Sequence, residues 1–149
     1  MTKIHENSTP PLFNLRVPAR ADRLKLIRSI VCDAALLCGC SDACAQDLML
    51  AVDEACQNII RHAYQGEDKG DIVVEMFHVA DHIDVFLCDS APTVNPATIH
   101  PRDLDDIRPG GLGTHIINSV MEGVTFQPLP SGAGNLLRMS KRITYTFKP

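Results

Sequence analysis

The segment that most constrains the fold is residues 48–64, which read LMLAVDEACQNIIRHAY. Apolar residues recur in it at the spacing of a helix with one buried side. They are Met49, Val52, Cys56, Ile59, Ile60 and Ala63. Glu54, Asn58 and His62 follow one another at intervals of four, which places them along one face of the same helix. The segment therefore predicts a helix that packs on a core with one side. A carboxylate, an amide and an imidazole lie on a side that faces away from that core.

That polar stripe has two interpretations when it is taken alone. An ordinary surface helix also carries a solvated face opposite its buried one, so the stripe by itself identifies no site. His62, late in the helix, is equally well explained as a cap of the last carbonyl groups or as a favourable charge at the negative helix end. Only the rest of the chain separates a functional stripe from a solvated one.

Length and charge limit the classes of protein to consider. With 149 residues and a net charge of −4, the chain suits a single domain, 1–149, in which residues 1–10 are expected to form a flexible tail. Its mixed charges provide no basic surface for nucleic acid and no polybasic segment for a membrane. No apolar run has the length of a signal-peptide core or of a membrane span. We therefore expect a cytoplasmic protein with protein or small-molecule partners.

The cysteines leave one further possibility open. In a cytoplasmic protein they are expected to be reduced thiols, and they lack the paired spacing of a zinc ribbon. Cys38, Cys40 and Cys44 nevertheless gather around a turn between two helices, which is compatible with metal binding or redox sensing. The alternative is that they are small buried apolar side chains, which is how free cysteine commonly behaves.

The order of predicted elements indicates an α+β fold. Strands are predicted at residues 12–17, 71–79, 83–88, 124–129 and 136–147, and helices at 20–38, from Ser41 through 64, and from 113. Residues 71–79 and 83–88 are expected to form an antiparallel hairpin, and four prolines between 90 and 112 predict a long loop. This order suggests a two-layer α/β sandwich in which three helices cover one face of a mixed, mostly antiparallel sheet.

Two further motifs carry chemical information. Gly110, Gly111, Leu112, Gly113 and Thr114 lead into the third predicted helix, where free backbone N–H groups and the helix dipole can bind phosphate. The segment fits neither the P-loop nor the dinucleotide fingerprint, and alone it is also explained as a hinge or a helix cap. Asp89, at a strand end, is suited to accept a hydrogen bond from the exocyclic amine of adenine, although a lone aspartate there is more often a turn residue.

Taken together and in this order, these motifs resemble those of the Bergerat-fold ATPases. This superfamily contains gyrase, the Hsp90 chaperones, histidine kinases and mismatch-repair proteins, and the chain is most similar to its anti-sigma factor serine/threonine kinases. The resemblance covers nearly the whole chain. It rests on four segments: AVDEACQNIIRHAY for the N-box, DSAPTVNP for the adenine contact, GGLGTHII for the phosphate segment and GNLLRMSKRI for the closing strand.

The resemblance implies a role for each motif. Asn58 matches the N-box ligand of the Mg²⁺ that bridges the triphosphate of ATP, and Glu54 matches the general base. Asp89 matches the adenine-binding aspartate, and residues 90–112 match the ATP lid. The remaining implied nucleotide contacts are His62, Ala91, Gly110, Gly111, Leu112, Gly113 and Thr114.

Two positions depart from the pattern of the superfamily. Ala91 stands where many relatives have glycine, which adds a methyl group beside the expected adenine. Leu136 lies close to where many relatives have a threonine that supports the adenine-binding aspartate, so the sequence predicts that one polar contact to the base is missing. Both departures predict a nucleotide affinity or base selectivity that differs from the family norm.

The function implied by the resemblance is ATP-dependent phosphorylation of a protein serine or threonine. The chain is expected to act in a partner-switching module, as a homodimer that binds a sigma factor or similar regulator and phosphorylates a small STAS-type anti-sigma factor antagonist. An alternative, motivated by Ala91 and Leu136, is a binding module in which the nucleotide only shapes the partner surface. A thiol or metal regulator built on Cys38, Cys40 and Cys44 is the third hypothesis.

Overall fold

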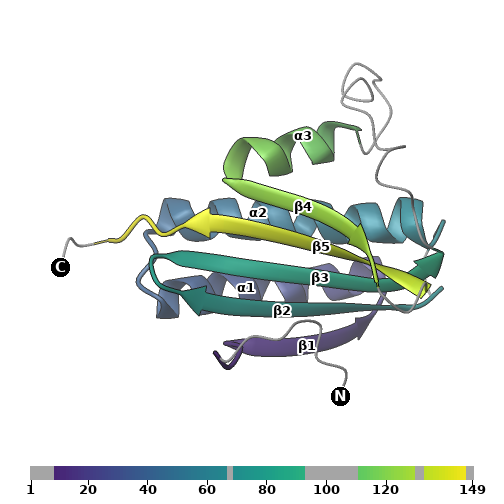
Figure 1. Cartoon of the computed structure of the whole chain (residues 1–149), viewed down its shortest axis with the longest axis horizontal. Helices are drawn as coiled ribbons and strands as arrows, with labels where there is room; N and C mark the ends of the chain where they lie inside the picture. Colours follow the sequence, from purple (N-terminus) through teal and green to yellow (C-terminus); the bar gives the residue numbers. More distant parts are fainter. Residues whose placement is uncertain (1–8, 67–68, 93–110, 130–132, 147–149) are drawn as a thin grey trace.

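The computed structural model describes residues 9–66, 69–92, 111–129 and 133–146, which form one sheet and its covering helices (Figure 1). Strand β1 (Phe13–Pro18) leads through the 3₁₀ turn η1 (Ala21–Arg23) into the helices α1 (Leu24–Leu37) and α2 (Asp42–Asn58). A π-helical turn, η2 (Ile59–Ala63), extends α2 and precedes strands β2 (Asp71–Val79) and β3 (His82–Pro92). Helix α3 (Gly111–Val120) and strands β4 (Gly123–Pro128) and β5 (Ala133–Arg142) complete the fold.

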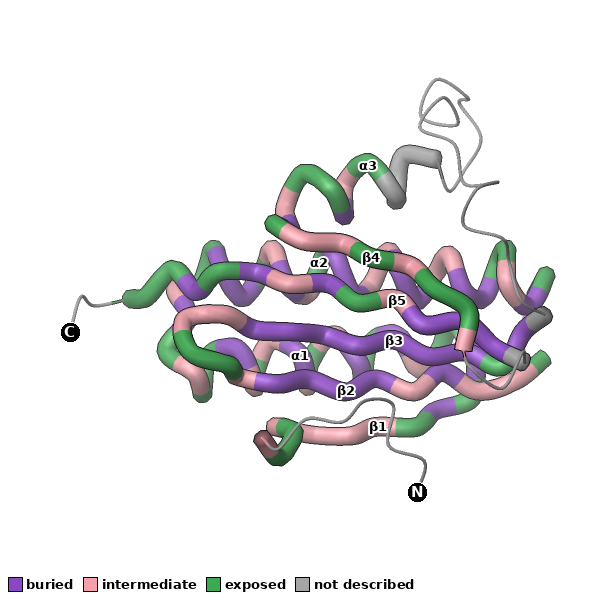
Figure 2. Tube along the Cα trace, in the orientation of Figure 1, coloured by how far each residue is buried: buried purple, intermediate pink, exposed green. Residues whose placement is uncertain are grey.

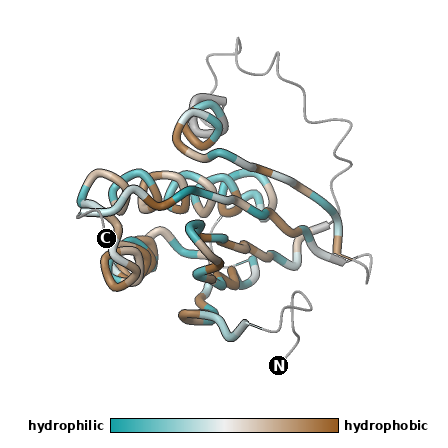
Figure 3. The backbone as a smooth tube through the Cα atoms, turned by 60° about the vertical axis from the view of Figure 1, so that its left-hand side comes forward, coloured by the Kyte–Doolittle hydropathy of each residue, from teal (hydrophilic) through white to brown (hydrophobic). Residues whose placement is uncertain are grey.

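The five strands form a sheet in the order β1-β2-β3-β5-β4, and the three α-helices lie on one side of it (Figure 3). The predicted α+β fold with two layers is therefore confirmed. The sequence predicted a mixed sheet, but every strand pairing within the described ranges is antiparallel. The strands β3 and β4, which α3 connects, do not pair with each other. The strand β5 lies between them and runs antiparallel to both.

The core lies between the sheet and the helices (Figure 2). Alternate residues of the central strands, such as Val85 and Leu87 of β3, face the helices, because successive side chains of a strand point to opposite faces. The predicted apolar stripe of α2 and η2 is confirmed at Val52, Cys56, Ile59 and Ile60, which are buried, whereas Met49 and Ala63 are only half-buried. Complete burial of an aliphatic side chain stabilises a fold by roughly 1.5–3 kcal/mol.

Local signals set several element boundaries correctly and missed others. The predicted N-cap of α2 is confirmed, because the Ser41 hydroxyl accepts a hydrogen bond of 3.2 Å from the N–H of Cys44. Strand β5 ends at Arg142 rather than at residue 147, because the chain then turns to pair Tyr145 with Cys40. No helix among the described residues is long and apolar enough to cross a membrane.

Two predicted segments fall largely outside the described residues. The expected tail, 1–10, is described only at residues 9 and 10. Of the expected lid, 90–112, the first three residues belong to β3 and the last two begin α3, whereas residues 93–110 lie outside the described ranges.

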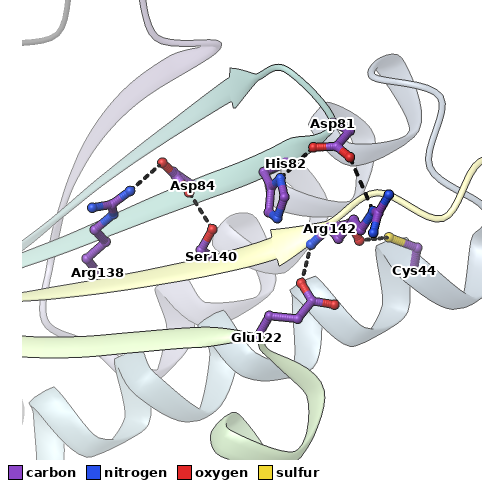
Figure 4. Close-up of polar contacts among 8 residues, drawn as sticks. All are labelled: Cys44, Asp81, His82, Asp84, Glu122, Arg138, Ser140 and Arg142. Carbon is purple, nitrogen blue, oxygen red and sulfur yellow. Dashed lines mark hydrogen bonds and ion pairs between the residues drawn. The ribbon is translucent and has the colours of Figure 1, made fainter.

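A group of polar contacts fastens the end of the sheet at which β2 turns into β3 (Figure 4). The buried carboxylate of Asp84 accepts hydrogen bonds from Arg138 at 3.0 Å and from Ser140 at 2.7 Å, which ties β3 to β5. At the turn itself, Asp81 contacts His82 at 2.7 Å and pairs with Arg142 at 3.2 Å. The backbone N–H of Arg142 also donates to the Glu122 carboxylate. This end of the sheet therefore has a structural role.

We expect Asp84→Ala to lower the free energy of unfolding by about 1–3 kcal/mol, because it leaves two cross-strand donors without their acceptor. Asp81→Ala is the matched control, since its carboxylate is 46% exposed and water replaces its contacts. Urea unfolding of both variants measures the difference. Equal losses of stability in the two variants would contradict the structural role given to Asp84.

Candidate functional site

Helix α2 presents Glu54 and Asn58 together. The helix is continuous through Asn58, so the interval of four places the two side chains on one side, one turn apart. Both residues are half-buried, whereas Ala55 and Cys56 between them are in the core. The side-chain oxygen of Asn58 lies 3.5 Å from a guanidinium nitrogen of Arg61. A carboxylate and an amide thus share the same edge of the helix.

His62 does not continue this stripe with α-helical geometry. It lies in the π-helical turn η2, where the N–H of Tyr64 bonds to the carbonyl of Ile59 at 2.9 Å, five residues earlier. His62 therefore follows Asn58 in a wider turn than the α-helix that the sequence spacing predicted. The His62 side chain is exposed. π turns inside helices occur frequently at functional sites, and this one directly follows Asn58.

Asp89 is a buried carboxylate on the helix side of the sheet. It follows Val85 and Leu87 in the alternation of β3 and is only 7% exposed. One carboxylate oxygen, Oδ1, accepts 3.0 Å hydrogen bonds from the Ala91 N–H and from the side-chain amide of Asn135. Burial raises the pKa of Asp89, and the contacts with Asn135 and Ala91 oppose that rise. A carboxylate held in this way has a fixed orientation.

The backbone around Asp89 is irregular in a manner suited to a site. Between Asp89 and Pro92, β3 has one residue more than the facing stretch of β5, which is a β-bulge. Such bulges often lie beside active sites, where they redirect a side chain. Gly134 approaches so closely that a Cβ atom there would lie 2.3 Å from the Asp89 carbonyl oxygen. Its φ of +121° also favours glycine.

Asn135 is a site residue that the sequence reasoning missed. It is 1% exposed and pairs with Asp89 across the β3–β5 ladder. Asp89 therefore has side-chain polar support from the residue next to Leu136. Leu136 packs with Phe77, Phe86 and Cys88 on the opposite face of the sheet. A polar residue directly after Gly134 in an apolar strand was the available signal, but only the strand register reveals its partner.

Ala91 is accommodated beside this carboxylate. Its side chain is 2% exposed and belongs to the core cluster between the sheet and the helices. Its N–H is one of the two donors that hold Asp89 Oδ1. The methyl group is thus packed within the protein, and the backbone of Ala91 helps to orient Asp89.

The glycine-rich segment is only partly described. Gly110 lies outside the described residues, while Gly111, Leu112, Gly113 and Thr114 form the first turn of α3. The helix therefore begins two residues earlier than predicted, and backbone N–H groups of a first helical turn have no partner within the helix.

The opposite end of α3 is firmly held. The Lys141 ammonium donates to the Val120 carbonyl at 2.7 Å and lies 3.6 Å from an Asp47 carboxylate oxygen on α2. Ile117 and Met121 are buried in the core. These contacts fix the carboxyl end of α3 relative to α2.

The parts of the candidate site meet at one end of the molecule. In Figure 1, the carboxyl end of α2, the end of β3 and the start of α3 lie at the same end of the sheet. Tyr64 directly follows η2, and its hydroxyl oxygen lies 2.8 Å from the backbone nitrogen of Ser90. This contact joins the carboxyl end of the helix to the end of β3. The structure thus brings the elements that carry Asn58 and Asp89 together.

The donor set fits a magnesium nucleotide. Mg²⁺ in nucleotide sites is held by few protein oxygens and by the phosphates of the substrate. The side-chain oxygen of Asn58 suits this arrangement, and the Glu54 carboxylate lies one turn away on α2. In the described parts of the chain, no three His, Cys, Asp or Glu side chains are grouped to hold a metal ion by themselves. The buried Asp89 carboxylate suits the amine of a purine base.

The cysteine cluster lacks the chemistry of a thiol or metal regulator. Cys40 and Cys44 are buried, and burial, together with the neighbouring Cys44 thiol, raises the pKa of Cys40 to about 12. Burial also raises the pKa of Cys38. Because the thiolate is both the nucleophile and the metal ligand, the raised pKa values of Cys38 and Cys40 disfavour the third hypothesis.

Known proteins resemble this chain over most of its length. The sequence profile of the histidine kinase-like ATPase domain matches residues 17–141. Serine-protein kinase RsbW of Listeria monocytogenes serotype 4a (strain HCC23) is 32% identical over 132 residues, which cover 83% of this chain and 81% of that protein. The protein of the same name from Bacillus pumilus (strain SAFR-032) is 27% identical over 146 residues, or 91% and 88% of the two chains.

Solved structures share the fold. The RsbU and RsbW domains of a Mycobacterium tuberculosis protein superpose with a TM-score of 0.65 at 15% identity, covering 92% of this chain and 33% of that one. The SiaB-SiaC complex from Pseudomonas aeruginosa gives a TM-score of 0.62 at 16% identity and coverages of 87% and 89%. At these identities the likeness shows the fold alone. The sequence relationships show more: the chain belongs to the histidine kinase-like ATPase domain family and, within it, to the anti-sigma factor serine/threonine-protein kinases.

Proposed function

We propose that this kinase uses ATP and Mg²⁺ to phosphorylate a serine or threonine of a small STAS-type anti-sigma factor antagonist in a partner-switching module. The observation that carries the proposal is the buried Asp89, oriented by Asn135 and Ala91 at the end of the sheet where α2 presents Glu54 and Asn58. The relatives named serine-protein kinase RsbW support the same reaction class.

Asp89 holds the base of the nucleotide in this proposal. An ionised carboxylate only accepts hydrogen bonds, and the exocyclic amine of adenine donates them. The contacts with Asn135 and Ala91 end on Oδ1, so they fix the plane of the carboxylate. A guanine base presents a carbonyl oxygen where adenine has this amine, and a carboxylate repels it. Asp89 therefore favours ATP over GTP.

The other residues act on the phosphates and on the acceptor hydroxyl. Asn58 would hold Mg²⁺ through its amide oxygen, and the bound ion neutralises charge on the triphosphate. Free N–H groups of the first turn of α3, at Gly111 and Gly113, are suited to the phosphate oxygens. Glu54 would remove the proton from the acceptor hydroxyl as its oxygen attacks the γ-phosphorus.

The partners follow from the family and remain part of the proposal. We infer that the chain binds a sigma factor or similar regulator, acts as a homodimer and works in the cytoplasm. The similarly folded Pseudomonas structure is a complex of two proteins, which supports a protein partner for this fold.

The alternative is a nucleotide-gated binding module without turnover. In the sequence, Ala91 and Leu136 are the two departures that suggest this alternative. In the structure, Asn135 gives Asp89 a polar contact that Leu136 cannot make, and Ala91 is packed in the core. The retained Glu54 favours turnover. Equal affinity for the antagonist with ATP and with a non-hydrolysable analogue, without any phosphoprotein, would instead favour the binding module.

A transfer assay tests the proposal. The protein is incubated with Mg²⁺, ATP labelled on the γ-phosphate and a STAS-type antagonist from the same genome that is shown to bind it. We expect label on one serine or threonine of the antagonist, and none when that residue is replaced with alanine. An antagonist that binds the protein but stays unlabelled would contradict the proposed activity.

A further inference from the structure

The hydroxyl group of Tyr64 joins three elements at the candidate site. It donates to the backbone carbonyl of Asp71 at 2.7 Å, at the start of β2. It accepts from the N–H of Ser90 at 2.8 Å, near the end of β3, and lies 3.0 Å from the Ser90 hydroxyl. Tyr64 itself directly follows η2, the extension of α2. One side chain thus connects the end of the helix to the ends of two strands.

This hydroxyl occupies a place within the β2–β3 ladder. The last pair in the register of these strands is Ile72 with Asp89, so Asp71 and Ser90 would form the next one. The Tyr64 oxygen bridges the carbonyl of Asp71 and the N–H of Ser90, two groups that face each other across the strands. The direct pairing of β2 with β3 therefore stops beside Asp89. Beyond that point, the Tyr64 side chain sets the separation between the two strands.

The ring of Tyr64 is seated as firmly as its hydroxyl group. The residue is 8% exposed and belongs to the main core cluster. Gly70 lies against the ring, and a Cβ atom at this position would be 2.6 Å from two ring carbons. Real Cβ atoms essentially never come this close, so only glycine leaves room for the ring in this position. Tyr64 is therefore held both by the packing of its ring and by the hydrogen bonds of its hydroxyl group.

We propose that Tyr64 is a positioning residue that sets the separation between the metal-binding and adenine-binding ends of the ATP site. Asn58 directly precedes η2, and Asp89 is the residue before Ser90. A ligand that engages both residues requires one distance between them, and the Tyr64 hydroxyl provides a direct hydrogen bond between the end of the helix and the strand beside Asp89. This inference rests on the proposed function, because it concerns the same nucleotide site.

Removing the hydroxyl has a specific consequence. In Tyr64→Phe the ring still fills the core, but the Asp71 carbonyl and the Ser90 N–H lose their common partner and the strand end can move relative to α2. ATP then gains less from the simultaneous contact of its base with Asp89 and of its metal with Asn58. The quantity that reports this linkage is the factor by which Mg²⁺ tightens ATP binding.

The test is calorimetric titration of ATP, with Mg²⁺ and with a chelator, into the wild type, Tyr64→Phe and Gly70→Ala. Gly70→Ala keeps the hydroxyl group but displaces the ring. All titrations are made below the unfolding transition of each variant, so that a loss of stability does not enter the dissociation constant. Tyr145→Phe is the matched control, since Tyr145 is the second of the two tyrosines and is 41% exposed.

We expect the Kd for ATP with Mg²⁺ to rise about three- to tenfold in Tyr64→Phe, and the Mg²⁺ factor to fall by a similar amount. Gly70→Ala should change both in the same direction, and Tyr145→Phe should change neither. A purely structural role for Tyr64 predicts an unchanged Mg²⁺ factor, and that result would overturn the inference alone. A wild type that binds no ATP would overturn the proposed function and this inference with it.

Discussion

We expect Glu54→Gln to bind ATP normally and to transfer its γ-phosphate about 10²–10⁴-fold more slowly than the wild type. The substitution keeps the size and polarity of the side chain but removes its ability to accept a proton. The helix that carries Glu54 and Asn58 is continuous, so we expect the substitution to leave the metal-binding and adenine-binding residues in place. Single-turnover transfer to the antagonist measures the rate, and calorimetry measures the affinity for ATP.

Asp53→Asn is the matched control for this experiment, because it makes the same chemical change one residue earlier. The Asp53 carboxylate accepts hydrogen bonds from Arg28 at 2.9 Å and from Gln57 at 2.8 Å, so it ties α2 to α1. We expect Asp53→Asn to lower the stability of the fold and to retain transfer. Transfer that is undiminished in Glu54→Gln would show that another group removes the proton.

The second large effect is expected at Asp89. Asp89→Asn retains the oxygen that accepts from Ala91 and Asn135, but it places an amide nitrogen, a donor, on the other branch of the side chain. A donor in that position repels the adenine amine, so we expect ATP to bind about ten- to a hundredfold more weakly, as for the loss of a charged hydrogen bond. Calorimetry with ATP measures the loss.

Asp84→Asn is the control, because Asp84 is the other buried carboxylate of β3 and lies toward the opposite end of that strand. It should lower stability without weakening the binding of ATP. Equal ATP affinity in Asp89→Asn and in the wild type would remove Asp89 from the site.

The same variant has the opposite effect on the stability of the protein without nucleotide. Burial raises the pKa of Asp89 above its ordinary value of 3.8, so the folded protein binds this proton more tightly than the unfolded chain. The contribution of Asp89 to the free energy of unfolding is full below that value and is lost as the pH rises through the raised pKa. Asp89→Asn lacks this loss. Urea unfolding from pH 3 to pH 7 should therefore show the variant gaining stability relative to the wild type as the pH rises.

The sequence was sufficient for those parts of the site that depend on local periodicity. The interval of four places Glu54 and Asn58 on one face of a continuous helix. The branched and aromatic residues at 83–88 predicted a strand before Asp89, although β3 continues past Asp89 to Pro92. The Ser41 cap also follows from residue type and position alone. Each of these signals needs no knowledge of what lies across the fold.

The parts that the sequence did not reveal depend on contacts between distant segments. The role of Asn135 follows from the register of β5 against β3, and a shift by one residue would give that role to Leu136. The π turn after Asn58 leaves no clear mark in the apolar spacing, so the sequence predicted α-helical geometry at His62. The sequence predicted Tyr64 only as the last residue of a helix. Its hydrogen bonds to Asp71 and Ser90 show that it also connects that helix to β2 and β3.

The central claim is that the end of α2 and the end of β3 form a single nucleotide site. A crystal structure of the protein with Mg²⁺ and a non-hydrolysable ATP analogue tests it most directly. We predict the adenine amine within hydrogen-bond distance of the Asp89 carboxylate, the metal on the side-chain oxygen of Asn58, and Glu54 facing the γ-phosphate. A nucleotide bound away from Asp89, or a metal without Asn58 among its ligands, would contradict the claim.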